Sequence, residues 1–218
     1  MSEYIKFRIK FEKTGIMKYI SHLDLNRLFA RALARAQIEL LHSEGFNPHP
    51  KITFGSALSL GTESLCEFAD VKITKTAGLE TGEEILKKTK GAFPPGINII
   101  EVYAPESDFK TIDKTRFHIF LKPQGFGICE LEQLFSGDVS VEKKPGNFIN
   151  LKDYICDIAV SRPFEAPEYI LADIVLKTNP QLFLGGENII KAINFKFTVD
   201  DYLIRKIETY DKNGDIFA

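Results

Sequence analysis

Tyr-Ile-Lys-Phe-Arg-Ile-Lys-Phe, residues 4–11, is the stretch on which the fold prediction depends. Apolar and basic residues alternate in it with period two, which is typical of a half-buried β-strand. Ser-His-Leu-Asp, residues 21–24, then predicts the start of a helix, with Ser21 as the N-cap and Asp24 three residues further on. The chain is therefore expected to begin with a strand and a helix.

The pattern continues outward from this pair of elements. Apolar residues repeat at spacings of three and four through about residue 37, which extends the helix: Leu25, Leu28, Phe29, Ala32, Leu33 and Ala36. A second helix is expected at 81–89, and the segments with the pattern of a strand are 38–41, 51–54, 67–73 and 97–103. This succession, with strand segments between the two helices and a strand at each end, favours the ferredoxin-like, split βαβ arrangement, whose order is strand, helix, strand, strand, helix, strand.

A polar, weakly periodic segment at 104–114 predicts a domain boundary, and the pattern begins again after it. Helices are expected there at 128–135 and 185–193, and strands at 115–121, 139–143, 147–158, 169–177 and 194–209. We therefore predict an α+β fold made of two tandem ferredoxin-like domains with antiparallel sheets, at residues 1–104 and 114–218.

Composition and charge limit the class of protein. The chain has 218 residues, of which 44% are hydrophobic and 27% charged, an ordinary globular mixture. It has no signal-peptide pattern and no run of about 18 apolar residues, so a soluble, cytoplasmic protein that does not enter a membrane is expected. The net charge is −2, but residues 1–60 carry nine Lys or Arg against five Asp or Glu, which indicates an anionic partner for this part.

Cysteine and histidine spacing gives no support for a metal or another cofactor. The cysteines form no Cys-x-x-Cys pair, so we expect three reduced and mostly buried thiols, at Cys66, Cys129 and Cys156. The histidines contain no pair at the spacing of a metal site: His22, His42, His49 and His118.

Arg27, Arg31 and Arg35 recur at spacing four and are predicted to form a ridge along one face of the first helix. An anion such as a phosphate backbone would relieve the repulsion between them. The alternative is a solvated face whose positive charges suit the carboxyl-terminal half of a helix. Asp24 falls on the same face, where it can pair with Arg27 or Arg31.

The segment Glu-Gly-Phe-Asn-Pro-His-Pro-Lys, residues 44–51, is predicted to form a stiff, exposed loop, here called the arch. Gly45 permits a positive φ, while Pro48 and Pro50 restrict the backbone. An aromatic ring, an amide, an imidazole and an ammonium group suit the binding of a base and a phosphate. The alternative is a plain connector with Phe46 in the core. The predicted binding residues are Arg27, Arg31, Arg35, Glu44, Phe46, Asn47, His49 and Lys51.

His22 lies in the first turn of the predicted helix, where the positive end of the helix dipole favours a neutral imidazole. A neutral imidazole can accept the proton of a ribose hydroxyl. His22 and His49 are therefore the candidate catalytic residues. The alternative for His22 is a polar surface residue beside the helix cap.

Two motifs carry a resemblance, Lys-Tyr-Ile-Ser-His-Leu-Asp-Leu at 18–25 and Ser-Glu-Gly-Phe-Asn-Pro-His-Pro-Lys-Ile at 43–52. They are similar to those of the radical SAM-linked protein family, an uncharacterised bacterial domain fused to, or encoded beside, a radical SAM protein. The likeness covers the first 75 residues strongly and the later ones, to about residue 193, more loosely. It implies a radical SAM protein as partner, and the gene neighbourhoods of the family suggest RNA.

These observations favour an accessory RNA-binding module that presents its substrate to a separate radical SAM enzyme. Three clustered cysteines would be needed for the iron–sulfur cluster of such an enzyme, and this chain has none so arranged. One alternative is a metal-independent endoribonuclease, since tandem ferredoxin-like domains with a basic helix also resemble the CRISPR repeat-cleaving enzymes. Another alternative is a protein–protein adaptor.

Overall fold

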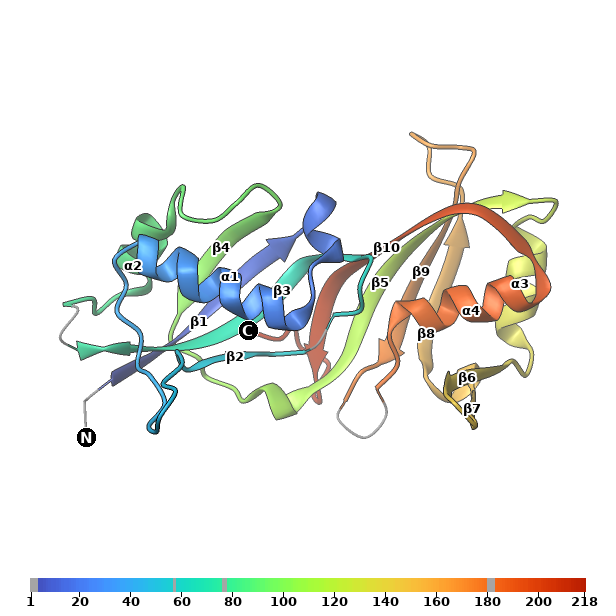
Figure 1. Cartoon of the computed structure of the whole chain (residues 1–218). Helices are drawn as coiled ribbons and strands as arrows, with labels where there is room; N and C mark the ends of the chain where they lie inside the picture. Colours follow the sequence, from blue (N-terminus) through green and yellow to red (C-terminus); the bar gives the residue numbers. More distant parts are fainter. Residues whose placement is uncertain (1–3, 57, 76–77, 180–182) are drawn as a thin grey trace. The chain divides into compact units, whose positions relative to one another are not determined.

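The chain divides into two compact units in a computed structural model that describes residues 4–56, 58–75, 78–179 and 183–218 (Figure 1). Unit 1 comprises residues 1–109 together with Ala218, and unit 2 comprises residues 110–217. Each unit combines helices with a sheet whose strands pair antiparallel. The predicted α+β class with antiparallel sheets is therefore confirmed.

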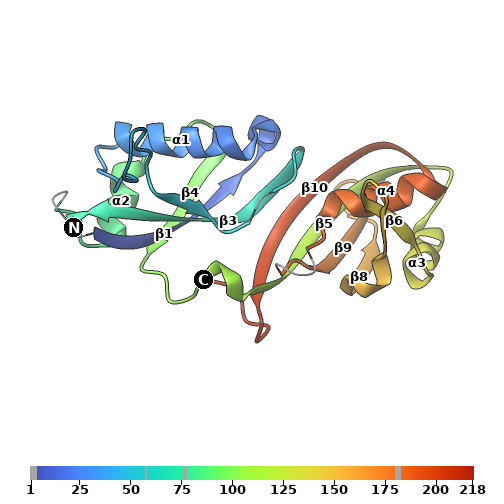
Figure 2. The ribbon, with the colours of Figure 1, turned by 60° about the horizontal axis from the view of Figure 1, so that its bottom comes forward.

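Unit 1 consists of a sheet with its two helices on one face, as Figure 2 shows for the longer helix α1. Its sheet has the order β4-β1-β3-β2, and all three pairings are antiparallel. The elements are β1 (Tyr4–Lys13), the short 3-10 helix η1 (Gly15–Tyr19), α1 (His22–Arg35), β2 (Ile52–Phe54), β3 (Thr62–Thr74), α2 (Gly82–Thr89) and β4 (Ile97–Tyr103).

Unit 2 has the corresponding order, β10-β5-β9-β8, again with antiparallel pairing throughout. A separate two-stranded hairpin of β6 and β7 lies between its first helix and β8. The elements are η3 (Phe109–Thr111), which begins at the end of unit 1, β5 (Ile112–Gln124), α3 (Ile128–Ser136), β6 (Ser140–Lys144), β7 (Asn147–Asn150), η4 (Leu151–Asp153), β8 (Ile155–Ser161), β9 (Ile170–Lys177), α4 (Gly186–Lys196) and β10 (Thr198–Asp211).

Each unit has its own hydrophobic core between helices and sheet. In unit 1 the fully buried ring of Phe29 on α1 packs among Phe11, Phe54 and Phe93, at centroid distances of 4.6, 5.2 and 4.9 Å. Such tilted aromatic contacts add to the free energy of burial. Phe29 therefore fixes α1 on the sheet.

The predicted strand at 38–41 is wrong, because only an isolated bridge between Leu40 and Ile73 forms there. The amide of Leu41 donates to the oxygen of Lys72, 2.7 Å away, and the chain then leaves the sheet. It returns as β2, which pairs further along the same strand β3. Leu40 and β2 thus pair with the same edge of β3, and the arch is the loop that joins them.

Three expectations for the rest of the chain are also corrected. The strand predicted at 147–158 is broken by η4, where the side chain of Asn150 caps the turn by accepting from the amide of Lys152. The last strand begins at Thr198 and not at 194, since α4 continues to Lys196. Cys66 is buried as expected, whereas the other two thiols, Cys129 and Cys156, are exposed.

One structural observation bears on the expectation that the protein does not enter a membrane. None of the helices in the described ranges is both long and apolar enough to cross one.

Arg8 departs from the alternation of β1, because its side chain is fully buried although it points away from α1. Its guanidinium is bidentate to Asp70 on β3, with Nε 2.7 Å from Oδ1 and Nη2 3.1 Å from Oδ2. The oxygens of Ser107 and Ala218 accept from it at 2.8 and 3.0 Å, and the ring of Phe109 covers it at 4.3 Å. The ion pair with Asp70, the two carbonyl acceptors and the covering ring thus compensate for the free-energy cost of burying this charge.

Removing the guanidinium should destabilise unit 1, because the buried Asp70 would lose its bidentate partner and keep Lys6, a partly exposed partner 2.7 Å from its Oδ2. We expect Arg8→Ala to lower the free energy of unfolding by about 3 kcal/mol, the lower end of the range for a broken buried ion pair, measured by denaturant titration. Arg27→Ala is the matched control, since the Arg27 side chain is 61% exposed and its ion pair contributes about 0–1 kcal/mol. Equal effects of the two substitutions would contradict this account.

Candidate functional site

Helix α1 begins as the sequence predicts, with a side-chain cap at Ser21. The Oγ of Ser21 accepts from the amide of Asp24 at 3.1 Å and donates to the carboxylate of Asp24 at 2.7 Å. These bonds satisfy an amide that has no partner within the helix. The hydroxyl of Ser21, followed by the guanidinium of Arg27, lowers the pKa of Asp24 below its usual range.

The arginine ridge exists, but its members differ in their contacts. All three side chains are exposed. Arg27 pairs with Asp24 at 3.1 Å, and Arg35 donates to the carbonyl oxygen of Ala92, 3.3 Å away in the loop after α2. Within the described part of the chain, Arg31 has neither a hydrogen bond nor an ion pair. Arg31 is thus the member most available to an anion.

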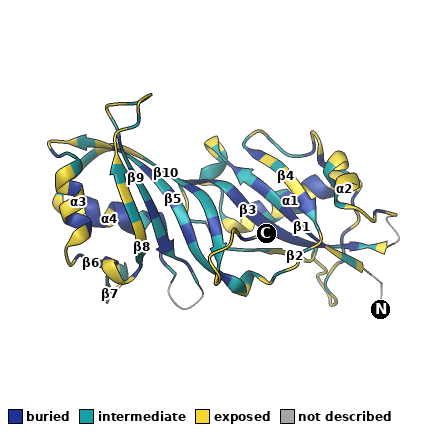
Figure 3. Ribbon diagram, turned by 180° about the vertical axis from the view of Figure 1, so that it is seen from behind, coloured by how far each residue is buried: buried dark blue, intermediate teal, exposed yellow. Residues whose placement is uncertain are grey.

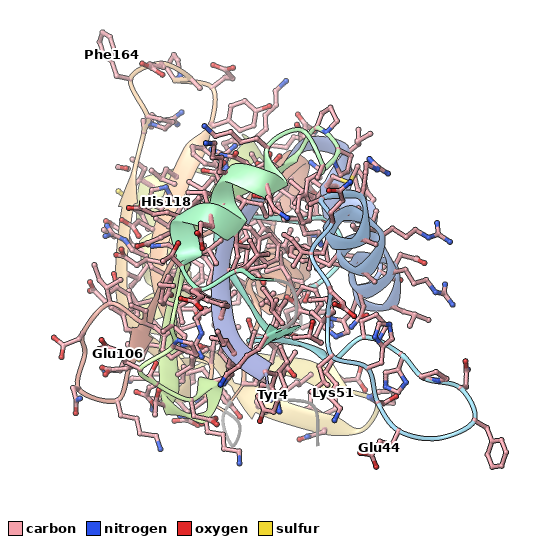
Figure 4. All side chains as sticks on the ribbon, turned by 90° about the vertical axis from the view of Figure 1, so that its left-hand side faces the viewer. Tyr4, Glu44, Lys51, Glu106, His118 and Phe164 are labelled. Carbon is pink, nitrogen blue, oxygen red and sulfur yellow. The ribbon has the colours of Figure 1, made fainter. Side chains whose placement is uncertain are left out.

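The arch is a closed loop that projects from the edge of the sheet of unit 1. Its base is held by the bridge between His42 and Pro50 and by the amide of Lys51, which donates to the oxygen of Leu41 at 2.8 Å. Figure 4 shows the loop between Glu44 and Lys51 extending away from the rest of the unit. Gly45 lies at φ +121°, a conformation that L side chains rarely adopt.

Ser43 and His49 close the arch by three hydrogen bonds. The amide of Ser43 donates to the oxygen of His49 at 2.9 Å, and the amide of His49 donates to the Oγ of Ser43 at 3.1 Å. The imidazole Nδ1 of His49 lies 2.9 Å from the same Oγ and 3.4 Å from the oxygen of Asn47. His49 therefore supports the loop with one ring nitrogen, and its Nε2 remains for a ligand.

The tip of the arch places an aromatic ring in solvent. The relative exposure of Phe46 is 112%, so the ring touches almost nothing of the protein. Asn47, Pro48 and Glu44 beside it are exposed as well. The alternative in which Phe46 enters the core is therefore wrong.

His22 is exposed at the first position of α1, and its ring meets the edge of Phe54 at a centroid distance of 5.3 Å. In the described ranges no carboxylate or carbonyl hydrogen-bonds to this imidazole. A general base is usually oriented by such a partner. The structure thus gives His22 an aromatic contact with Phe54.

A groove of about 390 Å³ lies between α1 and the base of the arch. Its lining is largely apolar: Ala30, Ala34, Gln37, Ile38, Glu39, Leu40, His42 and Pro50. Arg31 precedes Ala34 by three residues and Arg27 precedes it by seven, so both arginines lie on the helix face next to the groove. Arg35 turns to the opposite flank, toward Ala92.

The sequence did not single out the residues of this groove. His42 is the notable one, because its Nδ1 lies 2.9 Å from the oxygen of Leu40 and must donate to it, which leaves Nε2 of a neutral ring as an acceptor. The sequence feature that could have indicated the groove is the pair of small residues Ala30 and Ala34 beside the arginine ridge. Among the described residues, no three His, Cys, Asp or Glu side chains gather as a metal site requires.

A family model matches residues 6–182, which include the ridge, the arch and most of unit 2. The chain belongs to DUF2344. This family is described as an uncharacterized protein conserved in bacteria. No curated protein matches the chain. The match assigns DUF2344 no activity.

Removing the hydroxyl of Ser43 should loosen the arch without unfolding unit 1. In Ser43→Ala we expect the amide of His49 to exchange its hydrogen about two- to tenfold faster, because one hydrogen bond contributes about 0.5–1.5 kcal/mol. Hydrogen exchange followed by NMR measures this. Ser136→Ala is the control, since the Ser136 hydroxyl bonds only to Gln133 in unit 2. Unchanged exchange at His49 would show that this bond does not hold the arch.

Proposed function

We propose that this protein is an accessory RNA-binding module, built of two ferredoxin-like domains, that presents RNA to a separate radical SAM enzyme. The order of strands in each unit supports the classification, since the first strand lies between the third and the fourth and the second strand lies at an edge. The observation that carries the functional part is the phenyl ring of Phe46, held in water by a loop with both ends bound to the protein.

Keeping a phenyl ring in solvent forgoes a large stabilisation. Burying such a side chain stabilises a fold by about 1.5–3 kcal/mol. The protein forgoes this stabilisation at Phe46, and two prolines restrict the backbone of the arch that holds the ring in solvent. A base of single-stranded RNA offers a flat apolar face to such a ring. The amide of Asn47 and the Nε2 of His49 are polar groups of the kind that bind the edge of a base.

The phosphates of the same strand would contact Arg31 and Lys51. Both side chains are exposed and neither has an ion pair in the described residues. Arg27 is already paired with Asp24, and Arg35 already donates to the oxygen of Ala92. We therefore assign these two arginines smaller parts in phosphate binding than the sequence alone suggested.

The radical SAM enzyme enters the proposal through the resemblance of the two N-terminal motifs. The chain has three cysteines without the clustering that an iron–sulfur centre needs, so the chemistry would belong to the partner. The role of this chain would be to hold RNA close to that enzyme.

The absence of tryptophan from the sequence gives a direct test. Phe46→Trp introduces a single indole at the tip of the arch, and stacking on a base should quench its fluorescence when single-stranded RNA is added. Phe46→Ala should weaken binding about 5- to 150-fold, since stacking contributes about 1–3 kcal/mol per base. Fluorescence and anisotropy titrations measure both effects.

Phe195→Ala is the matched control, because this ring on α4 of unit 2 is 82% exposed. Arg31→Gln should reduce the slope of log affinity against log salt by about 0.7, the value for one phosphate of a single strand. RNA affinity that is equal in wild type and Phe46→Ala, with no change of indole fluorescence, would refute binding at the arch.

The endoribonuclease alternative finds no support at His22, which has no orienting partner in the described residues. Its remaining candidate is His49, whose ring is oriented through Nδ1 by Ser43 and Asn47. Incubation of RNA with the protein in EDTA decides against our proposal if specific cleavage occurs and disappears in His22→Ala or His49→Ala. The adaptor alternative predicts that Phe46→Ala abolishes binding to the partner enzyme but leaves RNA affinity unchanged.

A further inference from the structure

In the described residues of unit 2, helices pack against one face of the sheet and none packs against the other. Phe117, Ile119 and Leu121 of β5 belong to the buried core with α3 and α4. The alternate residues of β5 point the other way, and they include Arg116, His118 and Phe120. We call this second surface the open face; Figure 3 shows it from behind, where intermediate residues alternate with buried ones along most of β5 and β9.

A polar row crosses the open face, with Arg205 of β10, His118 of β5 and Asp173 of β9 directly opposite one another. Arg116 reaches Asp173 diagonally and binds it with two nitrogens, Nε at 2.8 Å from Oδ1 and Nη2 to Oδ2. The Nε2 of His118 is 3.6 Å from Oδ2 of the same carboxylate. These side chains stay accessible, with exposures of 40% for Arg116 and 28% for His118.

An apolar row lies two residues further along the same strands. Leu203, Phe120 and Leu171 are opposite one another on β10, β5 and β9. The ring of Phe120 stands edge-on to the imidazole of His118 at a centroid distance of 6.3 Å. The open face thus places an aromatic ring beside hydrogen-bonding groups, which suits a flat heterocycle with a polar edge.

Unit 1 contains a counterpart that indicates what completes such a site. There too an arginine of the first strand, Arg8, is bidentate to an aspartate of the third, Asp70. The chain itself covers the pair, with the ring of Phe109 over the guanidinium and the oxygens of Ser107 and Ala218 on its nitrogens. Arg8 is fully buried as a result. The Arg116 side chain is 40% exposed, and in the described residues no ring covers its guanidinium.

We propose that the open face of unit 2 binds a nucleotide of single-stranded RNA, with the base stacked on Arg116 and Phe120 and its polar edge toward His118 and Asp173. The bound base takes the place that the Phe109 ring has in unit 1. The choice of RNA as the polymer rests on the proposed function, whereas the affinity for a nucleotide follows from this surface alone.

The charges of the open face favour a base over a bare phosphate. Arg116 and Arg205 are matched by Asp173 and by Glu208, which lies opposite Arg116 and accepts from the hydroxyl of Tyr210 at 3.0 Å. Burial lowers the pKa of His118, and Arg116 and Arg205 lower it further against the opposing effect of Asp173, so the imidazole is neutral at pH 7. The hydrogen bond from Arg116 lowers the pKa of Asp173 and keeps it ionised. The four charged groups around His118 thus balance, while Lys114 and Lys177 lie further along the same face. Stacking and edge contacts therefore have to supply the affinity at His118.

The probe is adenosine 5′-monophosphate, with inorganic phosphate as the comparison, added to the full-length protein. The chain has four histidines, so the His118 imidazole signals can be assigned in NMR spectra with His118→Gln. We expect the nucleotide to shift these signals and to give nuclear Overhauser contacts between base protons and Phe120. Equal shifts with inorganic phosphate, or none with the nucleotide, would overturn the proposal.

Two variants and a control keep the test independent of folding. Phe120→Leu, which retains an apolar side chain, should weaken nucleotide binding at least about fivefold. Arg116→Gln combined with Asp173→Asn replaces the ion pair by an amide pair and should have a similar effect. Lys191→Gln changes an exposed charge of α4 and should have none. Unchanged affinity in both variants with unshifted melting temperature would refute the site.

Failure of this inference and failure of the arch are distinguishable. Phe46→Ala should leave the nucleotide response of His118 unchanged, because the two surfaces are in different units. A phenylalanine-containing peptide that shifts the His118 signals where the nucleotide does not would assign the open face to a protein partner and overturn the nucleotide proposal.

Discussion

The candidate site depends on how one edge of the sheet in unit 1 is hydrogen-bonded. The chain pairs with β3 at Leu40, leaves the sheet, and pairs with β3 again from Ile52. Both ends of the arch are therefore bound to the same rigid strand, and the Ser43–His49 bonds close the loop just above. A loop held at both ends retains its shape with few internal contacts, which is why Phe46 can stay in water without being absorbed into the core.

The second constraint is the docking of α1 through Phe29. The rings of Phe11, Phe54 and Phe93 surround it, which sets the rotation of the helix about its axis. That rotation puts Ala30 and Ala34 against the base of the arch and turns Arg35 toward Ala92 on the other flank. The burial of Phe29 thus explains both the groove beside the arch and the different surroundings of Arg31 and Arg35 on the ridge.

Local signals in the sequence predicted most of the elements, and non-local pairing decided the rest. The cap at Ser21 and the stripe through Leu33 depend on neighbours within one turn or two, and both are confirmed. The pattern at 38–41 could not reveal that the edge position is interrupted, because this depends on the register of β3. Spacing alone placed Arg27 and Arg35 in one ridge, but their contacts with Asp24 and Ala92 come from capping and from tertiary structure. The open face at His118 joins residues distant in sequence. The groove at His42 is lined by residues between 30 and 50, but it forms because the base of the arch folds back beside α1, and no short motif marks that arrangement.

RNA containing photoreactive 4-thiouridine, crosslinked to the full chain and mapped by mass spectrometry, tests the central claim most directly. The account predicts crosslinks in the peptide that spans residues 44–51, with a second set on β5 around Phe120. Crosslinks confined to other segments, such as the outer faces of α2 and α3, would contradict it.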